Sequence, residues 1–329
     1  DGFADLIIGA YGTDQNGPQS GSSYIVYGKP SAFSSSVSLS TLNGTTGFRL
    51  DGQASGDWTS KVSTAGDFNG DGFSDLTIGA PFAGPHGADS GSSYVVFGRA
   101  PDAAVSRTGS TARQVIRGGD QADTLTAAGT GDVLEGRDGA DALVGDVSTT
   151  ASYAYAPAGV LANLAQPALN TGVAAGDTYL TIVNLEGSRL DDTLTGDAGN
   201  NALTGGKGKD RLSGGPGKNR FVYRAASESP AGAAQSDVIL DFKPGTAATS
   251  VDKIDLSAVD AKMSVGGNQA FKFRGTAAFT GPGQIRLKKS GANLVIQGNT
   301  GGSLKPEFEI VLKGLASRAS FVTAKDFKL

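Results

Sequence analysis

Residues 187–222 place oxygen-bearing side chains at a fixed interval. Cut into nines, this stretch reads GSRLDDTLT, GDAGNNALT, GGKGKDRLS and GGPGKNRFV. The first position of each nine is glycine, and the sixth positions are Asp192, Asn201, Asp210 and Asn219. Carboxylate, amide and carbonyl oxygens are the ligands that Ca²⁺ prefers. The spacing therefore predicts a row of calcium sites; general acid–base use of the same carboxylates is the alternative.

A short strand in each nine must position these groups. The eighth positions are apolar, and the middle residue of a three-residue strand points to one face, so these residues form an inward column: Leu194, Leu203, Leu212 and Phe221. The other six residues must turn, which glycine permits because it adopts positive φ without a clash. Two nines make one coil, so coils stack about 4.8 Å apart and a calcium about 2.4 Å from each ligand fits between turns. The pattern predicts a parallel β-roll whose folding is coupled to calcium. A flexible glycine-rich linker is the alternative, and it leaves the apolar column unexplained.

A first block of nines occupies residues 118–144, which read GGDQADTLT, AAGTGDVLE and GRDGADALV. We predict metal ligands among the sixth positions and the turn residues of both blocks. They are Gly118, Asp120, Asp123, Asp132, Gly136, Asp138, Asp141, Gly187, Asp192, Gly196, Asn201, Gly205, Lys207, Asp210, Gly214 and Asn219.

Alternate nines should face opposite sides of the roll. Residues 18 apart then stack, which places Asp192 with Asp210 on one side and Asn201 with Asn219 on the other. Because ligand charge tunes calcium affinity, the aspartate side should bind calcium more tightly. The path of residues 145–186 decides whether Asp132 stacks over Asp192, and the sequence leaves this open.

The N-terminal part repeats with a period of 70 residues. DGFADLIIGA at 1–10 matches DGFSDLTIGA at 71–80, and GSSYIVYG at 21–28 matches GSSYVVFG at 91–98. A period this long, with two β-rich runs in each copy, predicts propeller blades. The first copy begins inside its motif, so we expect further residues before Asp1.

The second copy contains a predicted calcium loop. Oxygen-bearing side chains stand at positions 1, 3, 5 and 9 of the loop, with Gly72 at position 6: Asp67, Asn69, Asp71 and Asp75. Position 12 is Ile78 in a predicted strand, so the loop is not an EF-hand. Asp1 and Asp5 are the counterparts of Asp71 and Asp75 in the first copy. Ordinary hairpin turns at the Asp-Gly pairs are the alternative.

Three resemblances to known families follow. Residues 1–105 resemble the FG-GAP repeats of integrin α-subunit propellers and bacterial surface proteins, which implies Phe73 as a ligand through its carbonyl. The nines are similar to the calcium-binding nonapeptides of RTX proteins. Residues 187–329, with DVILDF at 237–242, DKIDLS at 252–257 and the terminal DFKL, resemble the C-terminal domain of serralysin-type secreted metalloproteases. This last resemblance implies a cap on the roll and a signal for type I secretion.

Together these patterns predict an all-β chain: partial FG-GAP propeller blades, a parallel β-roll and a β-rich cap. The predicted domains are FG-GAP repeats at 1–98, a linker at 99–114, a first RTX block at 115–144, a β-rich insertion at 145–186, the RTX β-roll at 187–222 and the serralysin-like domain at 223–329.

Composition restricts the function. The net charge of −4 excludes a nucleic-acid binding footprint, the absence of cysteine excludes thiol chemistry, and no apolar run reaches the roughly 20 residues of a membrane span. The only histidine is His86, and neither His-Glu-x-x-His nor G-x-S-x-G occurs, so we expect no enzyme within these residues.

Two functions remain open. One is a non-catalytic, calcium-binding region of a secreted or cell-surface RTX protein, exported by the type I machinery, whose blades bind a matrix or cell-surface ligand. The other is the export and folding module of a larger secreted hydrolase whose catalytic domain lies upstream.

Overall fold

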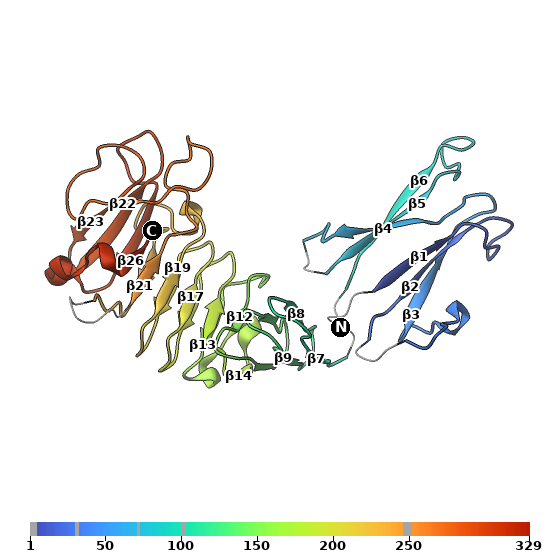
Figure 1. The fold of residues 1–329 in the computed structure, drawn as a ribbon, viewed down its shortest axis with the longest axis horizontal. Coiled ribbons are helices and arrows are strands. Elements are labelled where there is room, and N and C mark those ends of the chain that lie inside the picture. Colours follow the sequence, from blue (N-terminus) through green and yellow to red (C-terminus); the bar gives the residue numbers. More distant parts are fainter. Residues whose placement is uncertain (1–4, 30–32, 71–72, 100–102, 246–251) are drawn as a thin grey trace. The chain divides into compact units, whose positions relative to one another are not determined.

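The computed structural model describes residues 5–29, 33–70, 73–99, 103–245 and 252–329. The chain forms two compact units, Asp1–Ala100 and Pro101–Leu329 (Figure 1). The described residues contain β-strands and short 3₁₀ helices, which confirms the predicted all-β class. No helix among them is long and apolar enough to cross a membrane.

The first unit contains two antiparallel sheets of three strands. Their strands are β1 (Leu6–Ala10), β2 (Ser22–Val26) and β3 (Gly47–Asp51) in one sheet, and β4 (Lys61–Gly66), β5 (Asp75–Ala80) and β6 (Ser92–Val96) in the other, with η1 (Leu39–Thr41) between β2 and β3. Ile8 pairs with Tyr24 across β1 and β2, and Ile78 pairs with Tyr94 across β5 and β6. The 70-residue repeat of the sequence is therefore a repeat of strand register as well.

The second unit begins with a roll of three-residue strands. They are β7 (Ser106–Thr108), β8 (Val115–Arg117), β9 (Thr124–Thr126), β10 (Val133–Glu135), β11 (Ala142–Val144), β12 (Thr150–Ser152), β13 (Leu161–Asn163), β14 (Thr178–Leu180), β15 (Asn184–Glu186), β16 (Thr193–Thr195), β17 (Ala202–Thr204), β18 (Arg211–Ser213), β19 (Arg220–Val222), β20 (Asp237–Ile239) and β21 (Lys253–Asp255). Leu194 pairs with Leu212 and Leu185 with Leu203, so residues 18 apart stack in parallel as predicted.

One face of the roll runs without a break through both blocks of nines. One eight-stranded sheet joins β26, β21, β19, β17, β15, β12, β10 and β8 (Figure 1). The insertion 145–186 contributes β12 and β15 to this sheet, and it also contains β13, β14, η2 (Pro167–Leu169) and η3 (Gly172–Ala174). The opposite face is divided: β14 ends a four-stranded sheet, and β13 begins another eight-stranded sheet.

The structure differs from the sequence prediction at residues 99–114. These residues were expected to form a linker, but β7 lies within them and pairs with β9. The strand is hidden in the sequence because Arg107 stands where the other nines carry an apolar residue. Residues 109–117 (GSTARQVIR) form a further nine, with Gly109 first and the buried Ile116 eighth.

The C-terminal part caps the roll. It contains η4 (Ala226–Glu228), β22 (Lys272–Phe273), β23 (Gln284–Ser290), β24 (Asn293–Asn299), β25 (Phe308–Leu312), η5 (Ala316–Phe321), η6 (Ala324–Asp326) and β26 (Phe327–Lys328). β25 extends the roll sheet beside β20, and β26 extends the other sheet beside β21. Both roll sheets therefore continue into the cap.

One apolar column holds the second unit together. In all the roll strands except β7, β14 and β20, the middle residue is 0–2% exposed and belongs to one core cluster with the cap: Ile116, Leu125, Leu134, Leu143, Ala151, Ala162, Leu185, Leu194, Leu203, Leu212, Phe221 and Ile254. Each coil contributes two side chains to this column. The core is narrow, so each of these side chains carries a large share of the stability.

Truncating one member of the column should weaken the roll. Leu203 is fully buried between Leu185 and Phe221, and Leu203→Ala should cost about 2–5 kcal/mol through lost burial and the cavity it leaves. Leu190→Ala is the control, because Leu190 is 45% exposed in a turn and its loss should cost less than about 0.5 kcal/mol. Thermal unfolding of both variants in calcium measures the difference. Equal melting temperatures would contradict the column as the source of stability.

Candidate calcium sites

The sixth-position side chains form a ladder along the roll. All of them are buried, and each except Asn201 accepts a hydrogen bond from a backbone N–H one coil earlier. Oδ1 of Asp210 accepts from Asp192 N at 2.9 Å, and Oδ1 of Asp141 accepts from Asp123 N at 2.8 Å. On the other side, Oδ1 of Asn219 accepts from Asn201 N at 3.1 Å. One oxygen of each of these side chains is therefore fixed by the neighbouring coil, whereas Oδ1 of Asn201 accepts from Asp197 N in its own turn at 2.9 Å.

The glycine at the first position makes room for the other oxygen. A Cβ atom added at Gly205 would lie 2.1 Å from Oδ2 of Asp210, and one added at Gly136 would lie 2.1 Å from Oδ2 of Asp141. Carbon and oxygen atoms do not approach so closely without bonding, so no other residue fits at these positions. The pairing of a first-position glycine with a sixth-position aspartate is a packing requirement.

Three aspartate oxygens in the ladder lack a partner among the described residues. Oδ2 of Asp141, Asp210 and Asp237 is buried without a hydrogen bond. Burial, with the negative charge of neighbouring aspartates, raises the pKa of Asp210 to about 8 and those of Asp141 and Asp237 to about 7. A bound cation would supply the missing partner, because a buried carboxylate is costly unless it is paired or holds a metal. The donor set of hard oxygens therefore fits calcium.

The sequence prediction missed three aspartates that continue the ladder. Oδ1 of Asp177 accepts from Asp141 N at 2.9 Å, Oδ1 of Asp237 accepts from Asp210 N at 2.9 Å, and Oδ1 of Asp252 accepts from Asn219 N at 2.8 Å. None of the three belongs to a nonapeptide. The only signal available in the sequence was an aspartate at or just before a short apolar run, as in DVILDF.

Two acidic columns result on one side of the roll. We call Asp123, Asp141 and Asp177 the first acidic column, and Asp192, Asp210 and Asp237 the second acidic column. The first aspartate of each column accepts a hydrogen bond from a backbone N–H of the preceding coil. Val105 N donates to Asp123 and Val160 N donates to Asp192, both at 2.7 Å. The two columns therefore repeat one hydrogen-bond pattern.

On the asparagine side, the side-chain amides find hydrogen-bond partners within the protein. Asn219 donates through Nδ2 to the carbonyls of Gly215 and Pro216, and Asn201 donates to the carbonyl of Val183. These amide groups use turn carbonyls that a cation would otherwise need. Asp132 lies on this same side, next to Gln114, whose backbone N–H donates to it at 2.9 Å, and it does not stack over Asp192.

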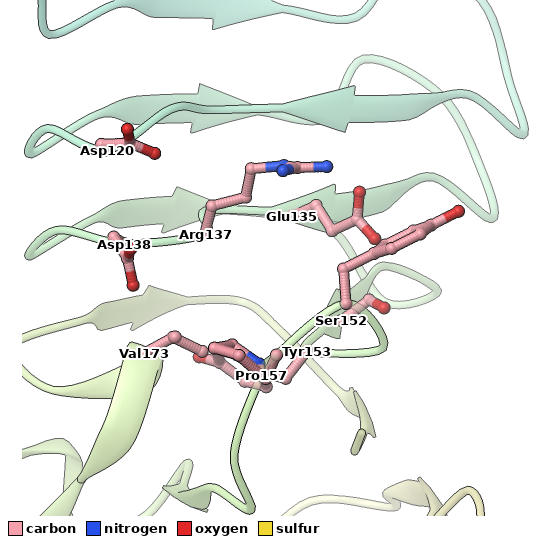
Figure 2. Close-up of a pocket in the computed structure, with 10 residues that line it drawn as sticks. Asp120, Glu135, Arg137, Asp138, Ser152, Tyr153, Pro157 and Val173 are labelled. Atoms are coloured by element: carbon pink, nitrogen blue, oxygen red, sulfur yellow. The ribbon is translucent and has the colours of Figure 1, made fainter. Parts of the chain in front are cut away.

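The predicted third-position residues lie outside the ladder. The side chains of Asp120, Asp138 and Lys207 are exposed. Asp120 and Asp138 project from adjacent turns at the rim of a small pocket of about 110 Å³ that Arg137 and Glu135 also line (Figure 2). Their side chains are not brought together with the buried carboxylates.

In the first unit, the last predicted ligand of the calcium loop, Asp75, also holds the loop in place through hydrogen bonds to the backbone. Asp75 is fully buried; Oδ2 accepts from Phe68 N at 2.6 Å and Oδ1 from Gly98 N at 2.8 Å. Asp5 repeats the second bond, accepting from Gly28 N at 2.9 Å. Asp67, Asn69 and Phe73 lie in the same loop, whereas Asp71 and Asp1 fall outside the described residues.

Acidic side chains alone do not form a site anywhere in the described ranges. No group of three or more His, Cys, Asp or Glu residues there is arranged to hold a metal ion. A calcium site in the roll must therefore draw on carbonyl oxygens of the turns as well as on the aspartates.

Three family models match the chain in the predicted order. The FG-GAP repeat matches residues 59–96, the RTX calcium-binding nonapeptide repeat (4 copies) matches residues 108–147, and the peptidase M10 serralysin C-terminal model matches residues 193–322. RTX nonapeptide repeats bind calcium ions, which confirms calcium as the cofactor. The repeat and C-terminal modules are non-catalytic domains, and both are typical of secreted proteins.

The solved structures similar to the chain include two subunits of one enzyme. One is a subunit of the mannuronan C5-epimerase of Azotobacter vinelandii, with a TM-score of 0.34 and 22% identity over 54% of this chain and 89% of that one. Another subunit of this epimerase has a TM-score of 0.26 and 18% identity, over 70% of this chain and 82% of that one. No curated protein matches the chain.

The two sides of the roll should differ in their calcium dependence. Asp210→Ala should raise the calcium midpoint for folding far more than Asn201→Ala, because Asp210 brings a charge and an unpaired oxygen whereas the Asn201 amide is paired within the protein. Circular dichroism during calcium titration of the two variants measures both midpoints. Equal shifts would contradict the assignment of the charged side as the tighter one.

Without calcium, acid should replace the cation in part. The ordinary pKa of aspartate is 3.8, and burial raises that of folded Asp210 to about 8 and that of Asp141 to about 7. Protonation therefore favours the folded roll; this stabilisation is complete below the ordinary value and is lost as the pH rises through about 7–8. In chelator, the chain should retain more β-structure at about pH 5 than at about pH 8.5. Asp210→Asn, which removes one such group, should show a smaller difference, and a chelated wild type that melts identically at both pH values would rule out this linkage.

Proposed function

We propose that this chain is the non-catalytic, calcium-binding region of a secreted or cell-surface RTX protein, in which calcium folds the roll after type I export. The observation that carries the proposal is the ladder of buried aspartates in which Asp141, Asp210 and Asp237 each retain an unpaired oxygen. Such a ladder is unfavourable until a cation enters it.

Aspartate oxygens of the two acidic columns and carbonyls of the glycine-rich turns would hold the ions. The carbonyl of Gly136 lies 2.5 Å from where a Cβ of Gly118 would stand, with Oδ2 of Asp123 2.3 Å from the same point. A carbonyl of one coil and a carboxylate oxygen of the previous coil, which also accepts from Gly119 N, therefore lie close together around this glycine. In the second acidic column, the corresponding atoms are the Gly205 carbonyl oxygen and Oδ2 of Asp192. They lie 2.5 and 2.4 Å from where a Cβ of Gly187 would stand.

The concentration of calcium would then decide when the roll forms. Extracellular calcium modules bind with dissociation constants of roughly 10⁻⁴–10⁻³ M. At cytosolic calcium levels the carboxylates would repel one another and the narrow apolar column would not compensate. Outside the cell the ions would bind and the chain would fold.

The position of the C-terminus supports export before folding. Phe327 is 6% exposed, and β26 pairs with β21 at the edge of a roll sheet. Asp326 is buried and accepts hydrogen bonds from Thr323 N and Gly245 N. A secretion signal in these last residues would be accessible to the type I machinery only while the roll is unfolded.

The FG-GAP unit would serve adhesion to a matrix or cell-surface ligand. Its exposed aromatic side chains, among them Phe68 at 69% and Phe97 at 55%, are groups that a partner would contact. The alternative function is a folding and export module for an upstream hydrolase. The FG-GAP match at residues 59–96, close before the RTX match, favours the non-catalytic role for this region.

Circular dichroism of the whole chain tests the proposal. In chelator the second unit should lack most of its β signal, and calcium at about 5 mM should restore it. Magnesium at the same concentration is the control, because Mg²⁺ demands a tighter octahedral shell and should not replace calcium. Identical spectra in chelator and calcium, or equal recovery with magnesium, would refute calcium-driven folding.

A further inference from the structure

The first acidic column ends at a residue that no nonapeptide supplies. Asp177 belongs to the insertion 145–186, immediately precedes β14 and is 1% exposed. Its Oδ1 accepts from Asp141 N at 2.9 Å, as Oδ1 of Asp237 accepts from Asp210 N at 2.9 Å in the second acidic column. The last aspartates of the two columns, Asp177 and Asp237, therefore make the same hydrogen bond through Oδ1. The surroundings of their Oδ2 atoms can then be compared.

The second oxygen of Asp177 is satisfied by a chain of hydrogen bonds. Tyr153 donates its hydroxyl proton to Oδ2 of Asp177 at 2.7 Å. The hydroxyl oxygens of Tyr153 and Tyr179 lie 2.5 Å apart, and Asn170 Nδ2 donates to the hydroxyl of Tyr179 at 2.9 Å. Because each hydroxyl has one proton, the direction is fixed: Asn170 donates to Tyr179, Tyr179 to Tyr153, and Tyr153 to Asp177. Both oxygens of Asp177 therefore have partners within the protein.

Tyr153 stands at the position that glycine occupies in the calcium-type turns. Gly136 follows β10, Gly187 follows β15 and Gly205 follows β17, whereas Tyr153 follows β12. The glycines leave space for a carboxylate oxygen, as the Cβ distances of 2.1–2.4 Å show. Tyr153 is 3% exposed and fills this region with a ring and a neutral donor. The turn after β12 thus lacks the glycine and gains a hydroxyl.

The second acidic column ends differently. Tyr223 follows β19 at the equivalent position, and its hydroxyl lies close enough to Asp237 to lower the pKa of that carboxyl, but the pair lacks the well-formed 2.7 Å hydrogen bond that joins Tyr153 to Asp177. Oδ2 of Asp210 also has no partner. The same residue type at the same place therefore closes the end of the first column with a full hydrogen bond, whereas Oδ2 of Asp237 at the end of the second column lacks one of that geometry.

We infer that Tyr153 replaces calcium at the end of the first acidic column, so that Asp177 is a structural residue and not a calcium ligand. Tyr153 is then a positioning residue: its hydroxyl limits the number of ions in the column and joins the insertion to the roll without a cation. This inference rests on the proposed calcium-binding function of the two columns.

Calcium counting by native mass spectrometry on the full chain tests the inference. Asp177→Asn should keep the wild-type number of ions, whereas Asp141→Asn should lose at least one. Tyr153→Phe should keep the number but lower the melting temperature of the calcium-loaded chain by about 5 °C, because a buried carboxylate loses its donor. Tyr155→Phe is the matched control, since Tyr155 is 40% exposed and its loss of a hydroxyl should leave both values unchanged.

Loss of an ion in Asp177→Asn, or a Tyr153→Phe chain that melts like Tyr155→Phe, would overturn the inference. The proposed function fails in a distinguishable way, because Asp141→Asn and Asp210→Asn would then also keep every ion. If a variant does not fold, crystals of the wild type grown with terbium give the answer by anomalous scattering. A terbium peak at Asp177 refutes the inference, and peaks at Asp141 and Asp210 without one at Asp177 support it.

Discussion

The second unit depends on a carboxylate that is bonded on one oxygen and unpaired on the other. The backbone N–H of one coil fixes Oδ1 of the aspartate in the next, which sets the register of the coils along the acidic side. Oδ2 of the middle aspartates then lies buried over a glycine with no donor in reach. The same side chain thus aligns the stack and creates its demand for a cation. A roll of three-residue strands, with one inward side chain in each, has little other free energy with which to offset that demand.

The regular part of this arrangement follows from the sequence, because period and chemistry coincide there. An apolar residue at every eighth position of nine and an oxygen at every sixth position determine strand length, coil length and the sides on which aspartate and asparagine stack. Leu194 over Leu212 and Asp192 over Asp210 could be predicted from spacing alone. The 70-residue repeat likewise predicted two related β segments, whose strand registers match.

The residues outside the nonapeptides could not be predicted, because their sequence does not repeat with the nine-residue period that marks the coils. Asp177, Asp237 and Asp252 reach the ladder after loops of other lengths, so no fixed offset identifies them. β7 escaped notice because Arg107 replaces the apolar residue that marks a strand elsewhere in the roll. The donor chain from Asn170 through Tyr179 to Tyr153 depends on packing inside the insertion. Such contacts are set by tertiary structure, and a single sequence carries no periodic signal for them.

The unbroken sheet from β8 to β26 has a consequence for how such a chain can change length over evolution. Every coil presents the same strand edge to the next, and the cap continues the two sheets from the last coil, through β20 with β25 and β21 with β26. A duplication or deletion of a whole coil would keep the sheet pairing between the last coil and the cap, whereas a change of a few residues would move every later aspartate away from the glycine that makes room for it. Tolerated length variation in the roll should therefore occur in whole coils, and the insertion 145–186 shows how other lengths are accommodated: it re-enters the same sheet through β12 and β15.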